Sequence, residues 1–204
     1  MSLVICVSIF NCGIYLVGDK RASTRCETGF KVFSDDVTKI FKINDFTAIG
    51  VTGSYEAGIS LSKFPDNYNK LSKVPIVYPD EIARCMQGFL RYQSSDIVNR
   101  NIFLAVAGID RFGIIRNFTI DGPSGFSLTD QSPSQDHPIT FSYHGDGNDD
   151  TCSKFISDFQ QIRGNVSDLS FNHKIVSCMQ NHINYVSSFV PTINEKTDVI
   201  VLKK

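Results

Sequence analysis

The sequence has no long apolar run, and this absence argues against a membrane-spanning segment. None of its apolar stretches reaches the roughly 20 residues that a helix needs to cross a bilayer. The first apolar run, residues 3–10, has no basic residue before it and no small-residue cleavage site, so a secretory signal is not expected. We therefore expect a cytoplasmic protein without a membrane partner.

An excess of charge of one sign is also missing. The chain carries 20 Lys and Arg against 21 Asp and Glu, which gives a formal net charge of −1, and it has no run of basic residues. Proteins that bind nucleic acid usually present a basic patch or a basic tail. Nucleic acid is therefore not an expected partner.

Clusters of metal-ligating residues are absent as well. The six cysteines form no C-x-x-C pair, and their spacing shows no regular relation to the four histidines. We therefore expect neither a metal nor another cofactor. Cys6, Cys85 and Cys178 lie within apolar patterns, where a cysteine usually packs as a small hydrophobic residue.

The composition is that of a globular protein with a large core. The chain has 204 residues, of which 42% are hydrophobic. A chain of this size buries enough apolar surface to fold as a single unit. We expect one domain that comprises residues 1–204.

The start of the chain predicts a buried β-hairpin. Residues 3–10 are apolar at nearly every position and rich in β-branched types, which is typical of a strand covered on both faces. Residues 11–13 have turn chemistry, and residues 14–17 return as a second apolar strand. Asp19 ends this hairpin, where its carboxylate would need a cation. The candidate cations are Lys20, Arg21 and Lys39.

The rest of the chain alternates strands and helices. The expected elements are strands at 39–44 and 46–53, a helix at 54–64 with Ser54 as N-cap, a helix from 79, strands at 102–109 and 114–120, a loop at 121–138, a strand at 139–144, helices from 149 and at 170–189, and a strand at 197–202. Two antiparallel sheets between two helical layers bury both sheets. We therefore expect an α+β fold, a four-layer αββα sandwich.

Three segments near the N-terminus resemble one known family. They are residues 13–23, which contain Asp19 and Arg21, residues 39–43, which open with Lys39, and residues 48–58, which contain Gly53. Together they resemble the N-terminal third of a proteasome β-type subunit, in the proteasome and HslV-like family of N-terminal nucleophile hydrolases. The order of strands and helices extends this resemblance to the whole chain.

The resemblance implies roles for specific residues. In this family the nucleophile is a Thr at the start of the mature chain, because its free α-amine, with an unperturbed pKa of about 7.7–8.0, takes the proton from its own side chain. The family pattern gives Lys39 the role of tuning that amine, Asp19 that of holding Lys39, and the N–H of Gly53 that of stabilising the oxyanion. Counting back from Asp19 reaches Leu3, which has no nucleophilic atom. Ser2, exposed by removal of Met1, is the candidate nucleophile.

Two functions remain open at this point. The first is a peptidase or amidohydrolase that uses Ser2, and the second is a catalytically inactive subunit that serves as a scaffold or binding protein. In the second case Asp19 and Lys39 form a structural ion pair and Gly53 only ends a strand. A further alternative is that Met-Ser-Leu is a leader before the natural start.

The resemblance also implies partners. These are further copies of the chain in a ring-like homo-oligomer, a peptide or unfolded-chain substrate, and a regulatory ATPase. Apolar helix residues are candidates for contacts between copies in the ring, namely Phe89, Tyr92, Phe155 and Phe159.

Overall fold

The computed structural model describes most of the chain. The described residues are 3–27, 29–53, 55–93, 101–145, 149–164 and 168–204. Ser2, the candidate nucleophile, and Ser54, the expected N-cap, both lie outside them. No helix in the described part is both long and apolar enough to cross a membrane.

Strands and helices follow one another in the order that the sequence predicts, with three further strands. The elements are β1 (Leu3–Ile9), β2 (Gly13–Asp19), β3 (Ala22–Cys26), β4 (Gly29–Ser34), β5 (Ile40–Lys42), β6 (Thr47–Thr52), α1 (Tyr55–Leu71), α2 (Pro79–Gln93), β7 (Phe103–Ile109), β8 (Ile115–Asp121), β9 (Ser127–Asp130), β10 (Ile139–Gly145), α3 (Asp149–Gln160), α4 (Leu169–Ser187) and β11 (Thr197–Lys203).

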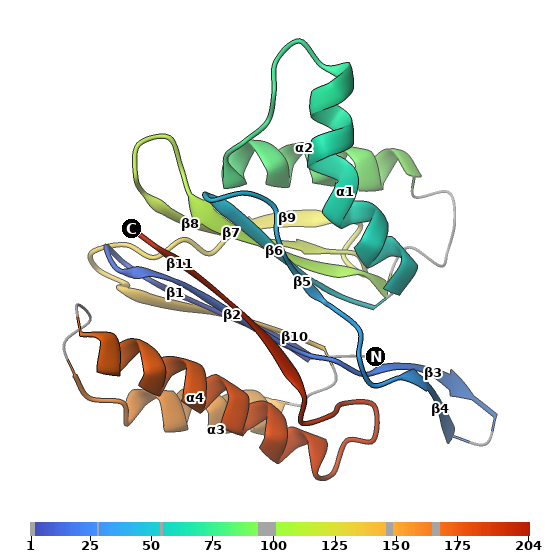
Figure 1. The fold of residues 1–204 in the computed structure, drawn as a ribbon, viewed down its shortest axis with the longest axis vertical. Coiled ribbons are helices and arrows are strands. Elements are labelled where there is room, and N and C mark those ends of the chain that lie inside the picture. The colour runs from blue at the N-terminus through green and yellow to red at the C-terminus, as the bar shows by residue number, and fades with distance from the viewer. Residues whose placement is uncertain (1–2, 28, 54, 94–100, 146–148, 165–167) are drawn as a thin grey trace.

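Two stacked sheets lie between two helical layers. One sheet has the strand order β10-β1-β2-β11 and the other β5-β6-β7-β8-β9, and every pairing in both is antiparallel. Helices α1 and α2 cover the five-stranded sheet, and α3 and α4 cover the four-stranded sheet (Figure 1). The predicted αββα sandwich is therefore confirmed.

The central hairpin is buried on both faces, as its apolar sequence predicts. Every residue of β1 and β2 is buried. Alternate residues of β1 face opposite layers, so that Ile5 packs against α3 and α4 while Val4 packs between the sheets. A third apolar cluster, which includes Ile49, fills the space under α1 and α2. The molecule therefore has three core layers, one at each interface between its four layers.

The two sheets approach closely because glycine faces the gap. A Cβ added to Gly50 would lie 2.6 Å from the Cγ1 of Val4, and one added to Gly18 would lie 3.1 Å from the Cγ2 of Ile40. The first contact is shorter than carbon atoms tolerate, and the second would require the Ile40 side chain to shift. This close approach brings the end of β2 near the start of β5.

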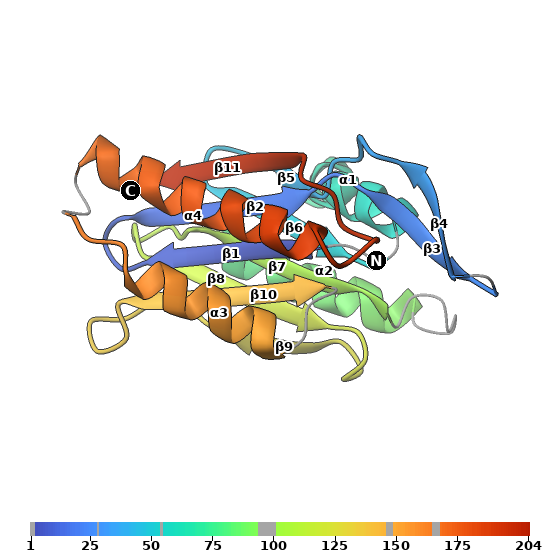
Figure 2. The same ribbon diagram turned by 90° about the horizontal axis from the view of Figure 1, so that it is seen from below.

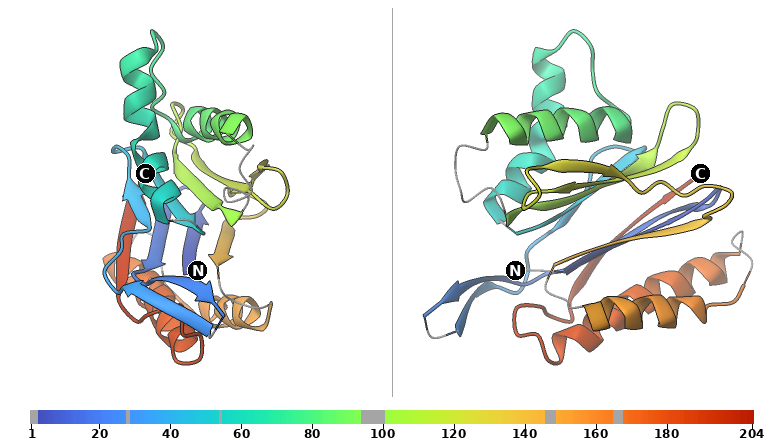
Figure 3. Two further views of the ribbon diagram at one scale, coloured as in Figure 1. Left: turned by 90° about the vertical axis from the view of Figure 1, so that its right-hand side faces the viewer. Right: turned by 180° about the vertical axis from the view of Figure 1, so that it is seen from behind.

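The sequence interpretation missed three short strands. Strands β3 and β4 form a two-stranded hairpin that extends away from both sheets (Figures 1 and 3). Strand β9 lies in the segment that we expected to be a loop, where it pairs with β8. These strands have little or no buried apolar face, and β4 is exposed along nearly its whole length. A search for buried apolar runs therefore does not find them.

Helix α1 is longer than expected. The prediction ended it at Phe64, and the next residue, Pro65, lacks the N–H that a helix interior uses. The helix instead continues to Leu71. The ring of Tyr68 packs 5.9 Å from that of Phe64, and the side chain of Asn69 donates to and accepts from the backbone of Ile76. The ring contact within the helix and the hydrogen bonds to Ile76 stabilise the helical turns after the proline.

Half of the residues proposed for contacts between copies are buried. Phe155 is 0% and Phe159 4% exposed, and both pack in the core under α3 and α4. They cannot contact another subunit in this fold, so that part of the prediction is wrong. Phe89 and Tyr92 on α2 are exposed, Tyr92 to 88%.

Candidate active site

Two charged residues from different elements meet at one end of the sandwich. Asp19 is the last residue of β2, and Lys39 directly precedes β5. The Lys39 Nζ lies 2.7 Å from Asp19 Oδ1. Both residues are buried, with exposed fractions of 0% for Asp19 and 8% for Lys39. The predicted approach of these two side chains is therefore confirmed, whereas their catalytic roles stay predictions.

Backbone groups hold the Asp19 carboxylate in place. The N–H of Leu3 donates to Oδ1 over 2.6 Å, and the N–H of Arg21 donates to Oδ2 over 2.9 Å. The Lys39 ammonium also donates to the carbonyl of Arg21 over 2.5 Å. A buried ion pair is tolerated when further hydrogen bonds satisfy both groups. The pair is thus fixed in one geometry.

The first residue of β1 lies directly at this ion pair. Leu3 is the residue that the family spacing assigns to the nucleophile, and its backbone nitrogen contacts the same oxygen as Lys39. Its side chain is fully buried in the apolar cluster under α3 and α4. The position next to the ammonium thus holds an aliphatic side chain. Ser2, bonded to that nitrogen, lies outside the described residues.

Gly53 ends the neighbouring strand in a conformation that favours glycine. It follows β6 with a φ of +100°, and a Cβ at this position would lie 1.9 Å from the carbonyl oxygen of Asn101. An L-residue rarely adopts this backbone conformation, and the space is closed to it. Gly53 is therefore required structurally, and its role toward an oxyanion stays a prediction.

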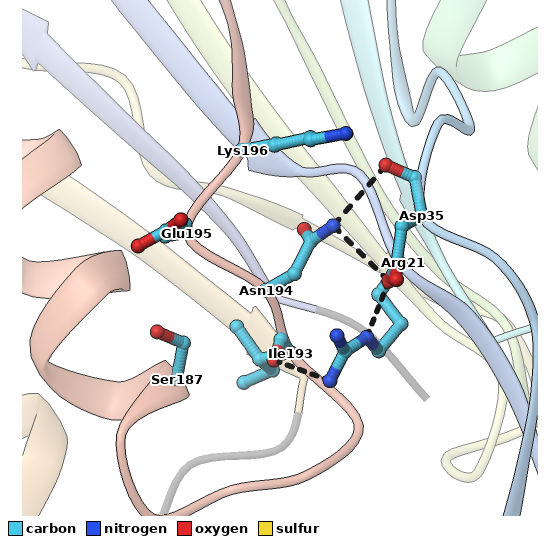
Figure 4. A pocket seen from close by; sticks show the side chains of 7 residues that line it. All are labelled: Arg21, Asp35, Ser187, Ile193, Asn194, Glu195 and Lys196. Atoms are coloured by element: carbon cyan, nitrogen blue, oxygen red, sulfur yellow. Dashed lines mark hydrogen bonds and ion pairs between the residues drawn. The ribbon is translucent and has the colours of Figure 1, made fainter.

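A polar network braces the loop that carries the ion pair. The guanidinium of Arg21 donates to Asp35 over 2.5 Å and to the carbonyls of Pro191 and Ile193 over 2.8 and 3.3 Å. Asn194 accepts from the N–H of Lys20 and donates to Asp35 (Figure 4). Arg21 thus ties the base of the β3–β4 hairpin to the loop after α4.

This network lines a small polar cavity of about 280 Å³. Its lining residues are Arg21, Asp35, Ser187, Ile193, Asn194, Glu195 and Lys196. Arg21 lowers the pKa of the Asp35 carboxyl, chiefly through their hydrogen bond. Sequence reasoning missed Asp35 and Asn194, because they lie 16 and 175 positions after Asp19 and belong to no motif.

Cys6, the cysteine nearest to the chain start, is not an alternative nucleophile. None of the six cysteines forms a disulfide, and Cys6 in β1 is completely buried between the sheets. Burial raises the pKa of the Cys6 thiol to about 12, so the reactive thiolate is not formed at neutral pH. No three His, Cys, Asp or Glu side chains in the described ranges gather as metal ligands would.

His144 stands near the start of β1 and is kept neutral by burial. It pairs with Val4 in the register of β10 and β1, and its ring stacks on Phe103 of the opposite sheet with centroids 5.8 Å apart. Burial lowers its pKa to about 4, against the opposing effect of the Asp121 charge. Its Nε2 has no hydrogen-bond partner.

We expect this buried histidine to make the fold sensitive to acid. Below a pH of about 6.5 the unfolded chain binds a proton at His144 and the folded chain does not, so the free energy of unfolding falls as the pH drops from 6.5 toward 4. Urea unfolding across this range should show the decline, and His144→Gln should reduce its slope. The exposed His137→Gln serves as the control. An unchanged slope in His144→Gln would contradict the expectation.

Comparisons with known proteins agree on the fold. No protein-family model matches the chain. In sequence it is similar to proteasome subunit beta of Mycolicibacterium gilvum, with 23% identity over 116 residues, which cover 55% of this chain and 34% of that protein. The same subunit of Mycolicibacterium paratuberculosis is 24% identical over 115 residues, 54% of this chain and 34% of that protein. The chain therefore spans about a third of the length of the curated relatives it matches.

The structural likeness extends over nearly the whole chain. Eukaryotic HslV from Trypanosoma brucei superposes with a TM-score of 0.65 at 21% identity and covers 99% of each chain. Anbu (ancestral beta-subunit) from Yersinia bercovieri superposes with a TM-score of 0.71 at 12% identity and covers 98% of this chain and 82% of that one. At these identities the likeness establishes the fold.

Proposed function

We propose that this chain hydrolyses peptide or other amide bonds, because it shares its fold with the proteasome β-subunit and HslV-like family of N-terminal nucleophile hydrolases. The observation that carries the proposal is the buried Lys39 ammonium, held by Asp19 at the first residue of β1. A structural ion pair could lie anywhere in the core. This pair lies where the family places its reacting terminus.

In the proposed reaction Ser2 is the nucleophile after Met1 has been removed. Its α-amine takes the proton of its hydroxyl, and the oxygen attacks the carbonyl carbon of the substrate. The positive charge of Lys39 disfavours a second ammonium beside it and so keeps the amine neutral. The N–H of Gly53 donates to the oxyanion, and the departing amine takes the proton back from the α-amine. Water then hydrolyses the resulting ester.

The short distance between Leu3 and Asp19 supports this assignment. The Leu3 nitrogen, to which Ser2 is bonded, lies 2.6 Å from the carboxylate oxygen that also holds Lys39. In the sequence Ser2 is the residue directly before this nitrogen, which is why we propose Ser2 as the nucleophile.

One observation favours the second candidate, an inactive scaffold subunit. The side chain at the family's nucleophile position, Leu3, is aliphatic and fully buried. In that case the Asp19–Lys39 pair would only anchor β1. Both candidates share assembly into a ring of identical copies, and for both we propose a cytoplasmic location. A peptide or unfolded-chain substrate belongs to the first candidate alone, and a regulatory ATPase would serve it by delivering that substrate.

Hydrolysis of fluorogenic peptides, together with the intact mass, tests the proposal. We expect loss of Met1 and measurable turnover, and a fall of about a hundredfold or more in Lys39→Ala and in Ser2→Ala. Lys42→Ala, which removes an exposed lysine paired only with Asp45, is the matched control and should keep full activity. Equal activity in Lys39→Ala and Lys42→Ala would refute the mechanism.

The same preparations also separate the two candidates. A protein that retains Met1, forms oligomers larger than a dimer by light scattering and cleaves no peptide is the scaffold. A monomer at micromolar concentration would refute ring assembly for both candidates.

A further inference from the structure

A groove runs between the two helices that cover the four-stranded sheet. Helices α3 and α4 lie side by side (Figure 2), and the cavity between them measures about 740 Å³. This volume is in the range of small-molecule sites, which is about 300–1,000 Å³. The lining residues are Lys154, Asp158, Gln161, Ile162, Arg163, Lys174, Ser177, Cys178, Asn181, His182 and Tyr185. None of them belongs to the candidate active site.

His182 lines this groove with an unsatisfied nitrogen. The residue is only 3% exposed, and its ring packs among aromatic neighbours, 5.2 Å from Phe155 and 5.7 Å from Tyr143. Its Nδ1 is buried without a hydrogen-bond partner. Leaving a buried polar atom unpaired is unfavourable, because the atom has lost its hydrogen bonds to water. A bound group that hydrogen-bonds to this nitrogen would recover that cost.

The surrounding hydrogen bonds define what His182 can bind. The Tyr143 hydroxyl donates its hydrogen to Thr151 over 3.2 Å. The Tyr143 oxygen, which lies 3.2 Å from Nε2 of His182, therefore accepts a hydrogen bond from that nitrogen. Burial lowers the pKa of His182 to about 4, so that the ring carries one proton near neutral pH. With that proton on Nε2, Nδ1 offers a lone pair. The matching ligand group is a donor such as a hydroxyl.

The groove also has an excess of positive charge. Its lining contains three cations and one carboxylate, and that carboxylate, Asp158, is paired with Lys154 over 2.9 Å. Lys174 donates to the carbonyl of Arg163, and Arg163 donates to the carbonyls of Gln160 and Ile162. Among the described residues neither forms an ion pair with a carboxylate, although the charge of Asp168 acts on Lys174 at longer range. These two cations near the end of α3 can therefore take an anion as a direct partner.

We propose that this groove binds a phosphate ester of a polyol, the chemical class to which sugar phosphates belong. The phosphate contacts Arg163 and Lys174, and a hydroxyl donates to Nδ1 of His182 after a small opening of the groove. Lys174 and His182 are eight positions apart on α4, or about 12 Å at 1.5 Å per residue.

A second copy of the chain is a poorer occupant than a small anion. Interfaces between subunits have an apolar centre that is depleted in charge. The lining here has four charged side chains, and of its two ring-bearing side chains Tyr185 is 44% exposed and already contacts Lys154. Burial of this surface against another protein would leave Arg163 and Lys174 without counter-charges.

Calorimetric titration of the full chain tests the site with three probes: ribose 5-phosphate, ribose and inorganic phosphate. We expect saturable binding of the ester, weaker binding of phosphate and none of ribose. The double variant Arg163→Ala/Lys174→Ala should lose about tenfold or more in affinity for the ester. Lys70→Ala/Arg84→Ala, which removes two exposed cations from α1 and α2, is the matched control and should bind as the parent does.

Two readouts test the histidine itself. His182→Phe keeps an aromatic ring and should bring the affinity for the ester down to that for phosphate. The ¹⁵N resonance of Nδ1 in the unaltered protein should shift with the ester and not with phosphate, a measurement that does not depend on the folding of a variant. Absence of saturable binding, equal binding of ester and phosphate, or an unaffected double variant would each overturn the proposal.

Discussion

Replacing Asp19 by alanine is expected to destabilise the protein by about 3–5 kcal/mol, because the Lys39 ammonium is then left buried without a counter-charge. The substitution also removes the acceptor of the Leu3 and Arg21 amides. We therefore expect a lower urea midpoint with an unchanged dependence on urea concentration. Any hydrolytic activity should disappear with it.

Two further variants separate burial of the charge from loss of the hydrogen bonds. The double variant Asp19→Ala/Lys39→Met removes the unpaired charge and should regain a large part of the lost stability. Asp36→Ala removes an exposed carboxylate, 76% accessible and paired with Lys20, and should behave as the parent does. If Asp19→Ala unfolds no more readily than Asp36→Ala, the buried pair does not hold β1 in place.

Gly53→Ala is expected to be the second most damaging substitution, at about 2–4 kcal/mol. The added methyl group would lie 1.9 Å from the Asn101 carbonyl oxygen, and the backbone at φ +100° disfavours any L-residue. Both the end of β6 and the start of β7 would have to shift. Thermal unfolding should report a much lower midpoint.

Another glycine provides the matched control for this substitution. Gly88 lies within α2, and a Cβ at that position has no atom within 4 Å. Alanine favours helix over glycine by about 0.5–1 kcal/mol, so Gly88→Ala should raise the midpoint slightly. If the Gly53→Ala variant unfolds at the same temperature as the parent, the end of β6 tolerates a side chain.

The sequence predicted the architecture because buried strands leave a strong pattern. The uninterrupted apolar residues of β1 and β2 indicated cover on both faces, and the helical spacing from Pro79 onward located α2. The β3–β4 hairpin has no such pattern, since its apolar side chains are exposed, Phe33 to 64%. Exposure removes the alternation that sequence reasoning depends on.

The candidate site could be predicted only in part. Asp19 was found because a carboxylate at the end of a buried hairpin needs a cation, and the family resemblance singled out Lys39 among three candidate cations. The structure pairs the two residues. The residues that support them, Asp35 and Asn194, come from distant loops whose approach depends on the whole fold. His182 belongs to no sequence motif, and only the packed structure shows that one of its nitrogens is unpaired.

The strand order has a consequence for how the chain acquires its structure. Strands β5 to β9 pair with their neighbours in sequence, although the segment between β6 and β7 contains α1 and α2, so that sheet can form before residues 139–204 have emerged. The other sheet places β1 between β2 and β10 and adds β11 at its edge, which joins residue 13 to residue 203. Pairings of such sequence separation form slowly. During synthesis on the ribosome, more than a hundred residues after the apolar β1–β2 hairpin must therefore emerge before β10 can pair with β1. In that interval the hairpin is the segment most in need of a chaperone.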